Sequence, residues 1–274
     1  MNQQLGGRCV AITGAARGIG LATARAVLDA GGRVAIGDID PGALEADIVR
    51  AAGDNLLVHQ LDVRNRSSFS EFLDVARTRF GELDVLVNNA GIMPIGPVLD
   101  ESDETARRIV DINVHGTILG TKLALERMAP RGHGQIVNVA SVAGRVASSG
   151  LATYCASKHA IVGFTESVRL EYATSGVQVC MVLPNFTATE LIAGTREPRF
   201  IGVLTPKLVA DAIVSIIDRP RPEIILPSII APTVLAQPIM PRRLRHLLTR
   251  ILATENSFLS PDTEARRGYN TRIG

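Results

Sequence analysis

The sequence predicts an α/β protein with a doubly wound, mostly parallel sheet and helices on both faces, and two observations predict it. Short apolar runs alternate with longer amphipathic stretches along the chain, which is the pattern of βαβ units. The first apolar run, CVAI at residues 9–12, leads directly into a glycine-rich turn and a helical stretch. Strands joined by helices are therefore expected from the amino terminus onward, with no room for a separate amino-terminal domain.

The individual elements follow from this alternation. Seven strands are expected, at Cys9–Ile12, Val34–Gly37, Leu56–Gln60, Val85–Val87, Gln135–Val139, Val177–Leu183 and Ile224–Leu226. Helices are expected between them, at about residues 18–30, 41–52, 67–80, 104–129, 153–174 and 206–218. In a chain of 274 residues, one domain of this kind is expected over residues 1–226, with residues 227–274 as a carboxyl-terminal extension.

The composition excludes several classes of protein. Hydrophobic residues make up 46% of the chain and charged residues 20%, which suits a soluble globular protein. No window reaches the roughly 18 consecutive apolar residues of a membrane span. A net charge of +2, with 4% aromatic residues and no tryptophan, indicates no nucleic-acid partner. The amino terminus lacks the pattern of a secretory signal, so a cytoplasmic location is expected.

The cysteines and histidines show no metal-ligand spacing. The three cysteines are interpreted as buried thiols in a reducing compartment. Cys155 has no histidine paired with it, so a nucleophilic role is not expected. No metal is expected. The residues considered are Cys9, Cys155, Cys180, His59, His115, His133, His159 and His246.

A glycine-rich segment, TGAARGIG at residues 13–20, follows the first strand. A strand, such a turn and a helix bring unpaired backbone N–H groups and the positive end of the helix dipole to one point, where a pyrophosphate binds. Gly14 allows the tight turn, Gly18 close approach to phosphate, and Gly20 close packing of helix on strand. A plain strand-to-helix turn needs one glycine rather than three, so the segment predicts nucleotide binding.

The spacing G-x-x-x-G-x-G resembles the cofactor loop of the short-chain dehydrogenase/reductase family, in its form of about 250 residues. The resemblance covers about residues 8–226. It implies a Rossmann-like fold and an NAD(P) cofactor bound at the carboxyl ends of the strands.

The second strand ends at Asp38, 24 residues after Gly14. A carboxylate there accepts hydrogen bonds from the adenosine ribose and repels a 2′-phosphate, which favours NAD over NADP. Arg17 in the glycine loop acts in the opposite sense, because a cation attracts that phosphate. NAD is the expected cofactor, with NADP the weaker alternative.

Further cofactor contacts are implied by the resemblance. Asp62 and Val63 occupy the adenine-contacting segment, NNAG at residues 88–91 is the turn beneath the cofactor, and Thr189 stands where a hydroxyl contacts the nicotinamide carboxamide. After Pro184 the family usually has glycine, whereas this chain has Asn185, which tolerates positive φ. The expected cofactor residues are Gly14, Arg17, Gly18, Ile19, Gly20, Asp38, Asp62, Val63, Asn89, Ala90, Gly91, Tyr154, Lys158, Pro184, Thr187 and Thr189.

The segment YCASK, residues 154–158, places a tyrosine and a lysine on one helix face, a turn apart. Alone, this pair is a weak motif. A free tyrosine, with a pKa near 10, is a poor base at neutral pH. An adjacent ammonium stabilises its anion, and an oxidised nicotinamide adds further positive charge. The resemblance implies that Tyr154 is the acid/base, that Lys158 also binds the nicotinamide ribose, that Ser141 holds the substrate oxygen, and that Asn113 positions a water in a proton relay.

The expected activity is the interconversion of a secondary alcohol and a ketone by hydride transfer. The expected substrate pocket comprises Ile92, Met93, residues 143–146, Phe186 and residues 190–205, and it is mostly apolar. A lipophilic small molecule is therefore the expected substrate. Two alternatives remain open: a protein that senses NAD with little turnover, and a protein that acts at a membrane surface.

The family commonly forms dimers or tetramers through the helices that carry Asn113 and Tyr154, so a homo-oligomer is expected. The tail adds a different feature. Residues 241–274 carry 7 basic and 3 acidic side chains, and residues 241–253 have an apolar stripe at helical spacing with arginines beside it. This predicts a basic amphipathic helix, which follows an apolar strip at residues 224–240. Both segments either pack on the enzyme's own subunits, covering the substrate cleft or an oligomer interface, or make a peripheral contact with an anionic membrane.

Overall fold

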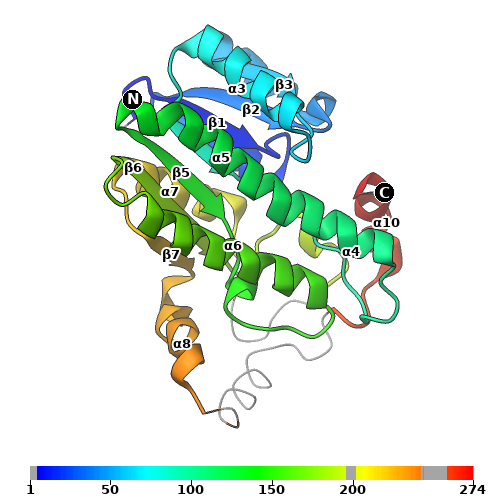
Figure 1. The fold of residues 1–274 in the computed structure, drawn as a ribbon. Helices are drawn as coiled ribbons and strands as arrows, with labels where there is room; N and C mark the ends of the chain where they lie inside the picture. Colours follow the sequence, from blue (N-terminus) through cyan, green and yellow to red (C-terminus); the bar gives the residue numbers. More distant parts are fainter. Residues whose placement is uncertain (1–4, 196–201, 242, 244–257, 274) are drawn as a thin grey trace.

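A computed structural model of the chain describes residues 5–195, 202–241, 243 and 258–273. Its core is a seven-stranded sheet in which every pairing is parallel (Figure 1). From one edge to the other the strands are β3 (Leu56–Gln60), β2 (Arg33–Asp38), β1 (Cys9–Thr13), β4 (Val85–Asn88), β5 (Gly134–Val139), β6 (Val177–Pro184) and β7 (Glu223–Leu226). The predicted Rossmann-like α/β fold with seven strands is confirmed.

The strand order reverses beside β1. The chain first moves outward through β2 and β3, then returns to the other side of β1 and continues from β4 to β7. Connections on the two sides of such a switch point diverge and leave a crevice above the carboxyl ends of the strands. The predicted cofactor residues follow these strand ends in the sequence, and this order of strands brings them to one edge.

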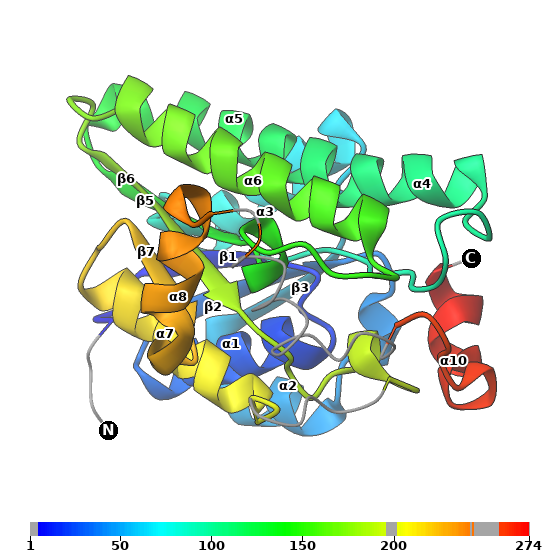
Figure 2. The same cartoon turned by 90° about the horizontal axis from the view of Figure 1, so that it is seen from below.

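Helices cover both faces of the sheet (Figure 2). One layer contains α1 (Gly18–Asp29), α2 (Ala46–Ala52) and α7 (Pro206–Asp218), and the other contains α3 (Arg66–Phe80), α4 (Asp103–Ile109), α5 (Gly116–Met128) and α6 (Ala152–Glu171). Val10 and Ile12 of β1 pack toward α1 and α7, whereas Cys9 and Ala11 pack toward α3 and α5. A strand buried on both faces needs apolar residues at every position, which explains why β1 has no polar alternation.

The one long helix predicted over residues 104–129 is divided in the structure. α4 ends at Ile109, a π-helical turn spans Val110–His115, and α5 begins at Gly116. Single π turns inside α-helices recur at functional sites, and this one carries Asn113. The helix predicted over residues 41–52 begins later, because a 3₁₀ turn at Pro41–Ala43 precedes α2.

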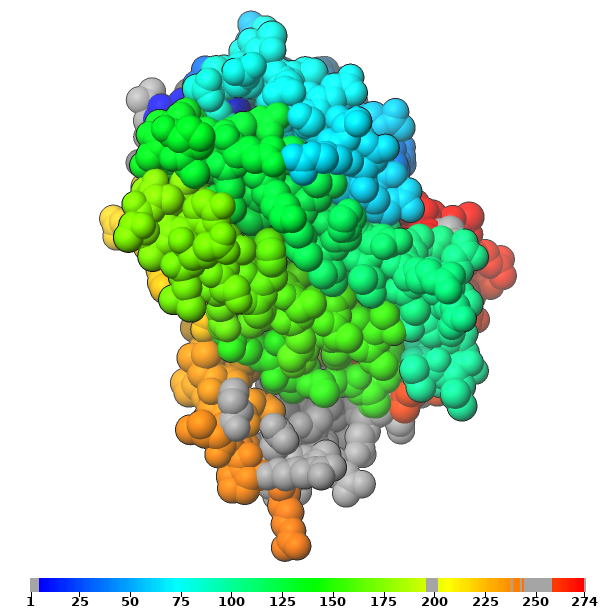
Figure 3. All heavy atoms as spheres, viewed as in Figure 1, coloured from blue at the N-terminus to red at the C-terminus, as the bar shows by residue number. Residues whose placement is uncertain are grey.

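After β7 the chain leaves the sheet. α8 (Ala231–Ala236) projects beyond the body of the molecule, and α10 (Thr263–Ile273) lies on the α4 side (Figures 1 and 3). The predicted basic helix of residues 241–253 lies outside the described residues except at 241 and 243. None of the helices described is long and apolar enough to cross a membrane.

Candidate active site

The carboxyl ends of the strands open on a cavity of about 800 Å³. It is lined by residues that follow β1, β2, β3, β4, β5 and β6, at the switch point of the sheet. Every predicted cofactor residue lines this cavity except Gly20. The strand order therefore collects residues from 14 to 189 around one space, as the sequence predicted for a nucleotide site.

The glycine loop has the shape that a phosphate cradle requires. Gly14 has φ +62°, and a Cβ there would lie 2.7 Å from Cα of Ala90. Gly18 has φ +56°, and a Cβ there would lie 3.3 Å from Cγ2 of Thr189. No side chain caps the amino terminus of α1, so its first N–H groups face the loop without a side-chain acceptor. These features fit the pyrophosphate of NAD(P).

Gly20 lies behind the loop rather than in the cavity. A Cβ at this position would be 2.4 Å from the carbonyl oxygen of Gly14 and 2.6 Å from Nδ2 of Asn89. That amide donates hydrogen bonds of 2.9 Å to the carbonyl oxygens of Thr13 and Gly14. Gly20 thus lets α1 pack on the turn, while Asn89 ties the turn to the loop after β4.

The acidic residues near the adenosine end already have partners. Oδ2 of Asp38 accepts from the backbone N–H of Ala16 at 2.9 Å, which fixes the carboxylate beside the glycine loop. The Arg17 guanidinium pairs with Asp40 at 2.9 Å. Arg64 binds the Asp62 carboxylate at 2.7 Å, and its hydrogen bonds hold the pKa of Asp62 below the usual value.

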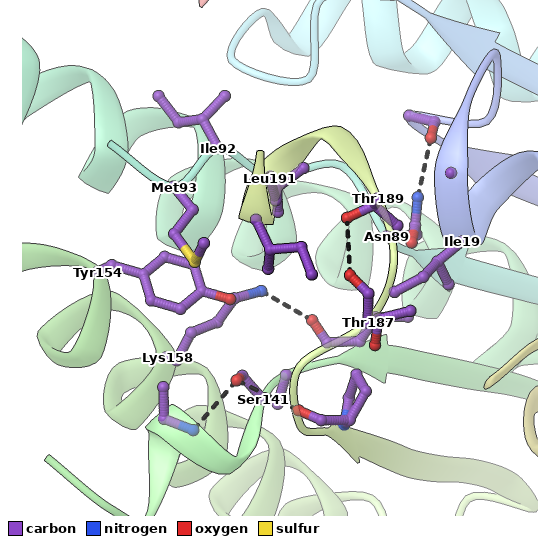
Figure 4. A pocket seen from close by; sticks show the side chains of 18 of the residues that line it. Ile19, Asn89, Ile92, Met93, Ser141, Tyr154, Lys158, Thr187, Thr189 and Leu191 are labelled. Carbon is purple, nitrogen blue, oxygen red and sulfur yellow. Dashed lines mark hydrogen bonds between the residues drawn. The ribbon is translucent and has the colours of Figure 1, made fainter. Parts of the chain in front are cut away.

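Ser141, Tyr154 and Lys158 point into one part of the cavity (Figure 4). Oγ of Ser141 accepts from the N–H of Ala143 at 3.1 Å and donates to the carbonyl oxygen of Pro184 at 3.3 Å. Nζ of Lys158 donates to the carbonyl oxygen of Val139 at 3.0 Å and lies 5.7 Å from the centre of the Tyr154 ring. Tyr154 and Lys158 are a turn apart on α6, and both are buried.

Burial dominates the titration of this pair. It raises the pKa of Tyr154 above its ordinary value, and the hydrogen bond with Ser141 offsets this only in part. Burial lowers the pKa of Lys158 to about 8. The expectation that the lysine ammonium and the oxidised nicotinamide together stabilise the tyrosinate stays a prediction. An anionic Tyr154 requires both a protonated Lys158 and further positive charge beside it.

Asn113 does not line the cavity. It is fully buried in the π turn, where Oδ1 accepts from the N–H of Ile92 at 2.8 Å. Its Nδ2 donates to the carbonyl oxygen of Ile92 at 3.0 Å and to Oγ of Ser157 at 3.1 Å. These contacts fix the loop after β4. The water-positioning role implied by the resemblance stays a prediction. One lone pair of Asn113 Oδ1 is left to accept a hydrogen bond from such a water.

The apolar residues predicted for the substrate side do line the cavity, with three corrections. Ile92, Met93, Ala143, Val146, Phe186, Glu190, Leu191 and Ile192 face it. Gly144 and Arg145 do not, because Arg145 is bound by Glu166 at 2.5 Å and Glu223 at 3.1 Å. From the range 190–205, only positions 190–192 line the cavity among the described residues. The left-handed turn considered for Asn185 does not form, since its φ is not positive.

The tail also lines the cavity, which was one expectation for residues 224–240, but its individual lining residues were not predicted. Residues of the tail enter the cavity from two directions: Phe258, Tyr269, Arg272 and Ile273 on one side, and Ile229, Ile230, Thr233, Val234 and Gln237 on the other. Phe258 stacks on Phe186 with ring centres 5.3 Å apart. No local sequence pattern indicates which loop a distant tail residue touches, so these contacts could not be predicted.

Thiol and metal chemistry have no support in the residues described. Cys9, Cys155 and Cys180 are free and buried, and burial raises the pKa of Cys155, which disfavours the thiolate. Across the described ranges, no group of three His, Cys, Asp or Glu side chains is arranged to hold a metal ion.

Comparison with known proteins identifies the family. The sequence matches the short chain dehydrogenases over residues 8–199. The chain belongs to the short-chain dehydrogenase/reductase family. It is therefore an oxidoreductase that acts on CH–OH donors with NAD(P).

Three members of the family illustrate the similarity. The chain is 39% identical over 226 residues to cis-4-hydroxycyclohexanecarboxylate dehydrogenase of Sinomonas cyclohexanicum, covering 78% of this chain and 90% of the relative. It is 36% identical to 3beta-hydroxysteroid dehydrogenase 2 of Eggerthella lenta, covering 74% of this chain and 79% of that one. The crystal structure of 3-ketoacyl-(acyl-carrier-protein) reductase from Brucella melitensis, complexed with NADH, superposes with a TM-score of 0.73 at 25% identity and covers 81% of this chain and 97% of the other.

Proposed function

We propose that this short-chain dehydrogenase interconverts a lipophilic secondary alcohol and its ketone, with NAD as cofactor. The observation that carries the proposal is the meeting of Ser141, Tyr154 and Lys158 in one cavity whose other wall is apolar. NAD supplies the hydride acceptor and, in its oxidised form, a positive charge near the reacting carbon. The residues of this chain supply the proton transfer and the orientation.

In the alcohol-to-ketone direction, Oη of Tyr154 takes the hydroxyl proton as the carbinol carbon loses hydride. The buried tyrosinate is stabilised by protonated Lys158, which is the reason for placing the lysine a turn away on α6. When substrate binds, Oγ of Ser141 turns its one proton from the carbonyl oxygen of Pro184 to the substrate oxygen and orients the carbinol. In the reverse direction, Tyr154 returns its proton to the oxygen of the ketone.

NAD is proposed over NADP because of how the charged side chains beside the expected adenosine ribose are held. Asp38 is fixed by the N–H of Ala16 at 2.9 Å, so its charge stays where a 2′-phosphate would lie. Arg17, the cation that would attract that phosphate, is paired with Asp40 at 2.9 Å. Both contacts favour a ribose with free hydroxyl groups.

A lipophilic substrate is proposed because the cavity wall beyond Tyr154 is mostly apolar. Met93, Leu151, Tyr154 and Phe258 form a buried cluster there, with Phe186 packed against it. Relatives named for a hydroxycyclohexane acid and for hydroxysteroids support a cyclic secondary alcohol.

The test is a panel of cyclic and steroidal secondary alcohols with purified enzyme, measured with NAD and with NADP. We expect turnover of at least one cyclic alcohol and a higher kcat/KM with NAD. The ketone product is followed by chromatography, so that turnover is measured separately from NAD binding. NAD binding without oxidation of any alcohol would support the NAD-sensing alternative.

Two proposals on assembly accompany this function. Val110 is 44% exposed beside Asn113, and Leu170 on α6 is 79% exposed, which supports pairing of these helices in a homo-oligomer. Light scattering that gives a monomer at micromolar concentration would count against it.

The second of these proposals is a peripheral contact with a membrane. Ile229 and Ile239 on the α8 side are 84% and 88% exposed, and basic residues follow them in the sequence. Salt-sensitive co-sedimentation with anionic liposomes tests this contact.

A further inference from the structure

The carboxyl-terminal segment 258–273 is fitted into the body of the enzyme by two glycines. Gly194 has φ +69°, and a Cβ there would lie 2.4 Å from the carbonyl oxygen of Asp262. Gly150 has φ +77°, and a Cβ there would lie 2.7 Å from the backbone and side chain of Phe258. The backbone N–H of Asp262 also donates to the carbonyl oxygen of Gly194 at 2.9 Å. The loops at positions 150 and 194 therefore make room for this segment.

Arg266 of α10 joins the two loops that form the substrate side of the cavity. The side chain is 1% exposed. Its Nη2 donates to the carbonyl oxygen of Met93 at 2.5 Å, after β4, and its Nη1 donates to those of Leu191 at 2.7 Å and Ala193 at 3.0 Å, after β6. One guanidinium thus fixes both loops, a geometry that the single ammonium of lysine cannot reproduce.

Tyr269, one turn further along α10, binds the same residue, Met93, through its backbone N–H. Its Oη accepts from the N–H of Met93 at 2.7 Å, so Met93 is bound through both its N–H and its carbonyl oxygen. The guanidinium carbons of Arg266 and Arg272 lie 4.7 and 5.5 Å from the centre of the Tyr269 ring. Tyr269 is 5% exposed and lines the cavity.

The hydroxyl of Tyr269 has a hydrogen bond left to give. A phenol both accepts and donates. Its acceptor function is taken by Met93, while the described residues accept no hydrogen bond from its proton. Burial raises the pKa of Tyr269 and keeps the proton in place at neutral pH, while Arg266 and Arg272 act in the opposite sense and Glu190 adds to the rise. A buried donor in a cavity indicates an acceptor on the bound molecule.

We propose that α10 forms a recognition subsite for a second oxygen on the substrate, separate from the oxygen of the reacting carbinol. Tyr269 is the specificity-determining residue, which donates to that oxygen, and Arg266 is the positioning residue, which holds Tyr269 and the two loops together. The substrate class is a lipophilic secondary alcohol that carries a second oxygen group, a ketone, carboxylate or hydroxyl. This inference rests on the proposed function and specifies its substrate.

The experiment compares two alcohols that differ only in the second oxygen: a hydroxysteroid with a ketone elsewhere on the ring system, and the same steroid without that ketone. The enzymes are wild type, Tyr269→Phe, Arg266→Met, Arg266→Lys and the control Arg267→Met. Arg267 follows Arg266 on α10, but its side chain is 73% exposed and forms an ion pair with Glu264 at 2.6 Å. NAD affinity, measured by isothermal titration calorimetry, reports whether each variant is folded at the cofactor end.

We expect Tyr269→Phe to lower the ratio of kcat/KM between the oxygenated steroid and its counterpart by about tenfold, since one hydrogen bond to the substrate is lost. Arg266→Met should raise KM for both steroids, with Arg266→Lys intermediate and NAD affinity unchanged. Arg267→Met should match wild type.

An unchanged ratio in Tyr269→Phe overturns the recognition role, and an unchanged KM in Arg266→Met overturns the positioning role. If either variant lowers kcat for both steroids equally, while KM and the ratio of kcat/KM between them stay constant, α10 has only a structural role and the inference is overturned. A wild-type enzyme that oxidises no secondary alcohol contradicts the proposed function and this inference with it, so the two failures are distinguishable.

Discussion

The cofactor end and the substrate end of the cavity are built in different ways. At the cofactor end, consecutive residues of the segment 13–20 form the cradle, and their backbone conformation gives it its shape. At the substrate end, Arg266 reaches the carbonyl oxygen of Met93 across 173 residues of sequence. The first end depends on local glycine geometry and the second on side chains that meet only in the folded chain. Mutations should therefore separate cofactor affinity from substrate affinity.

Tyr154→Phe tests the junction of the two ends. The variant keeps the buried ring but loses the acid/base hydroxyl, so kcat should fall at least about a hundredfold, while NAD affinity stays near that of wild type. Steady-state kinetics and cofactor titration measure the two effects. Tyr172→Phe is the matched control, because Tyr172 caps the far end of the same helix, outside the cavity. Retained turnover in Tyr154→Phe would contradict the proposed mechanism.

Gly14→Ala should damage the cofactor end alone. The added Cβ would lie 2.7 Å from Cα of Ala90 at a φ of +62°, so both strain and a backbone clash oppose it. We expect NAD affinity to fall about thirtyfold, which corresponds to about 2 kcal/mol. Gly53→Ala is the control, because Gly53 has φ +51° but open space around the added Cβ. Equal losses in the two variants would mean that the cradle is not a binding site.

Lys158 gives a pH-dependent test. Burial lowers its pKa from 10.5 to about 8, so the unfolded chain binds more protons than the folded chain above about pH 8. The cost of burying the charged lysine is full below that pH and is relieved as the pH rises toward the unfolded value. Denaturant unfolding should show this as a rise of about 1 kcal/mol between about pH 8 and 9 in wild type relative to Lys158→Met. The difference isolates the lysine, since the buried cysteines titrate alike in both proteins. No difference between the two curves would refute the buried, destabilised ammonium.

Asp38→Ala should change cofactor preference at the outer part of the cofactor end. Removal of the carboxylate removes the repulsion of a 2′-phosphate, while Arg17 stays paired with Asp40. The ratio of kcat/KM for NAD over NADP should fall about fivefold, which corresponds to about 1 kcal/mol. Asp40→Ala in the same background frees Arg17 and should lower the ratio further. A wild type that already prefers NADP would show that Asp38 has been misinterpreted.

The sequence predicted the cofactor end closely because its signals are local. The apolar runs of β1 and β6 are recognisable without knowledge of the fold, and the residues that follow them reach the cavity through strand order. Tyr154 and Lys158 were predictable for the same reason, as a pair on one helical turn. Arg145 shows the limit: its sequence position lies within the pocket segment, yet Glu166 and Glu223 hold it away from the cavity.

The substrate end was only half predictable. Apolar residues such as Met93 and Phe186 follow strands, so their place in the cavity could be inferred. Tyr269 and Arg266 belong to a segment whose position depends on pairing with carbonyl groups far away in sequence. Hydrophobic periodicity reports which face of a helix is buried, but not against which loop.

Gly194→Ala is the mildest test and addresses the substrate end alone. The added Cβ would lie 2.4 Å from the carbonyl oxygen of Asp262, so the start of α10 must shift while Arg266 itself is unchanged. KM for a lipophilic alcohol should rise about threefold, less than 1 kcal/mol, because the helix can yield where the glycine loop cannot. NAD affinity should not change. Gly81→Ala carries a similar φ of +85° in open space and controls for backbone strain. If Gly194→Ala weakens NAD binding as much as it raises KM, the two ends are coupled through α10 and cannot be treated as separately built.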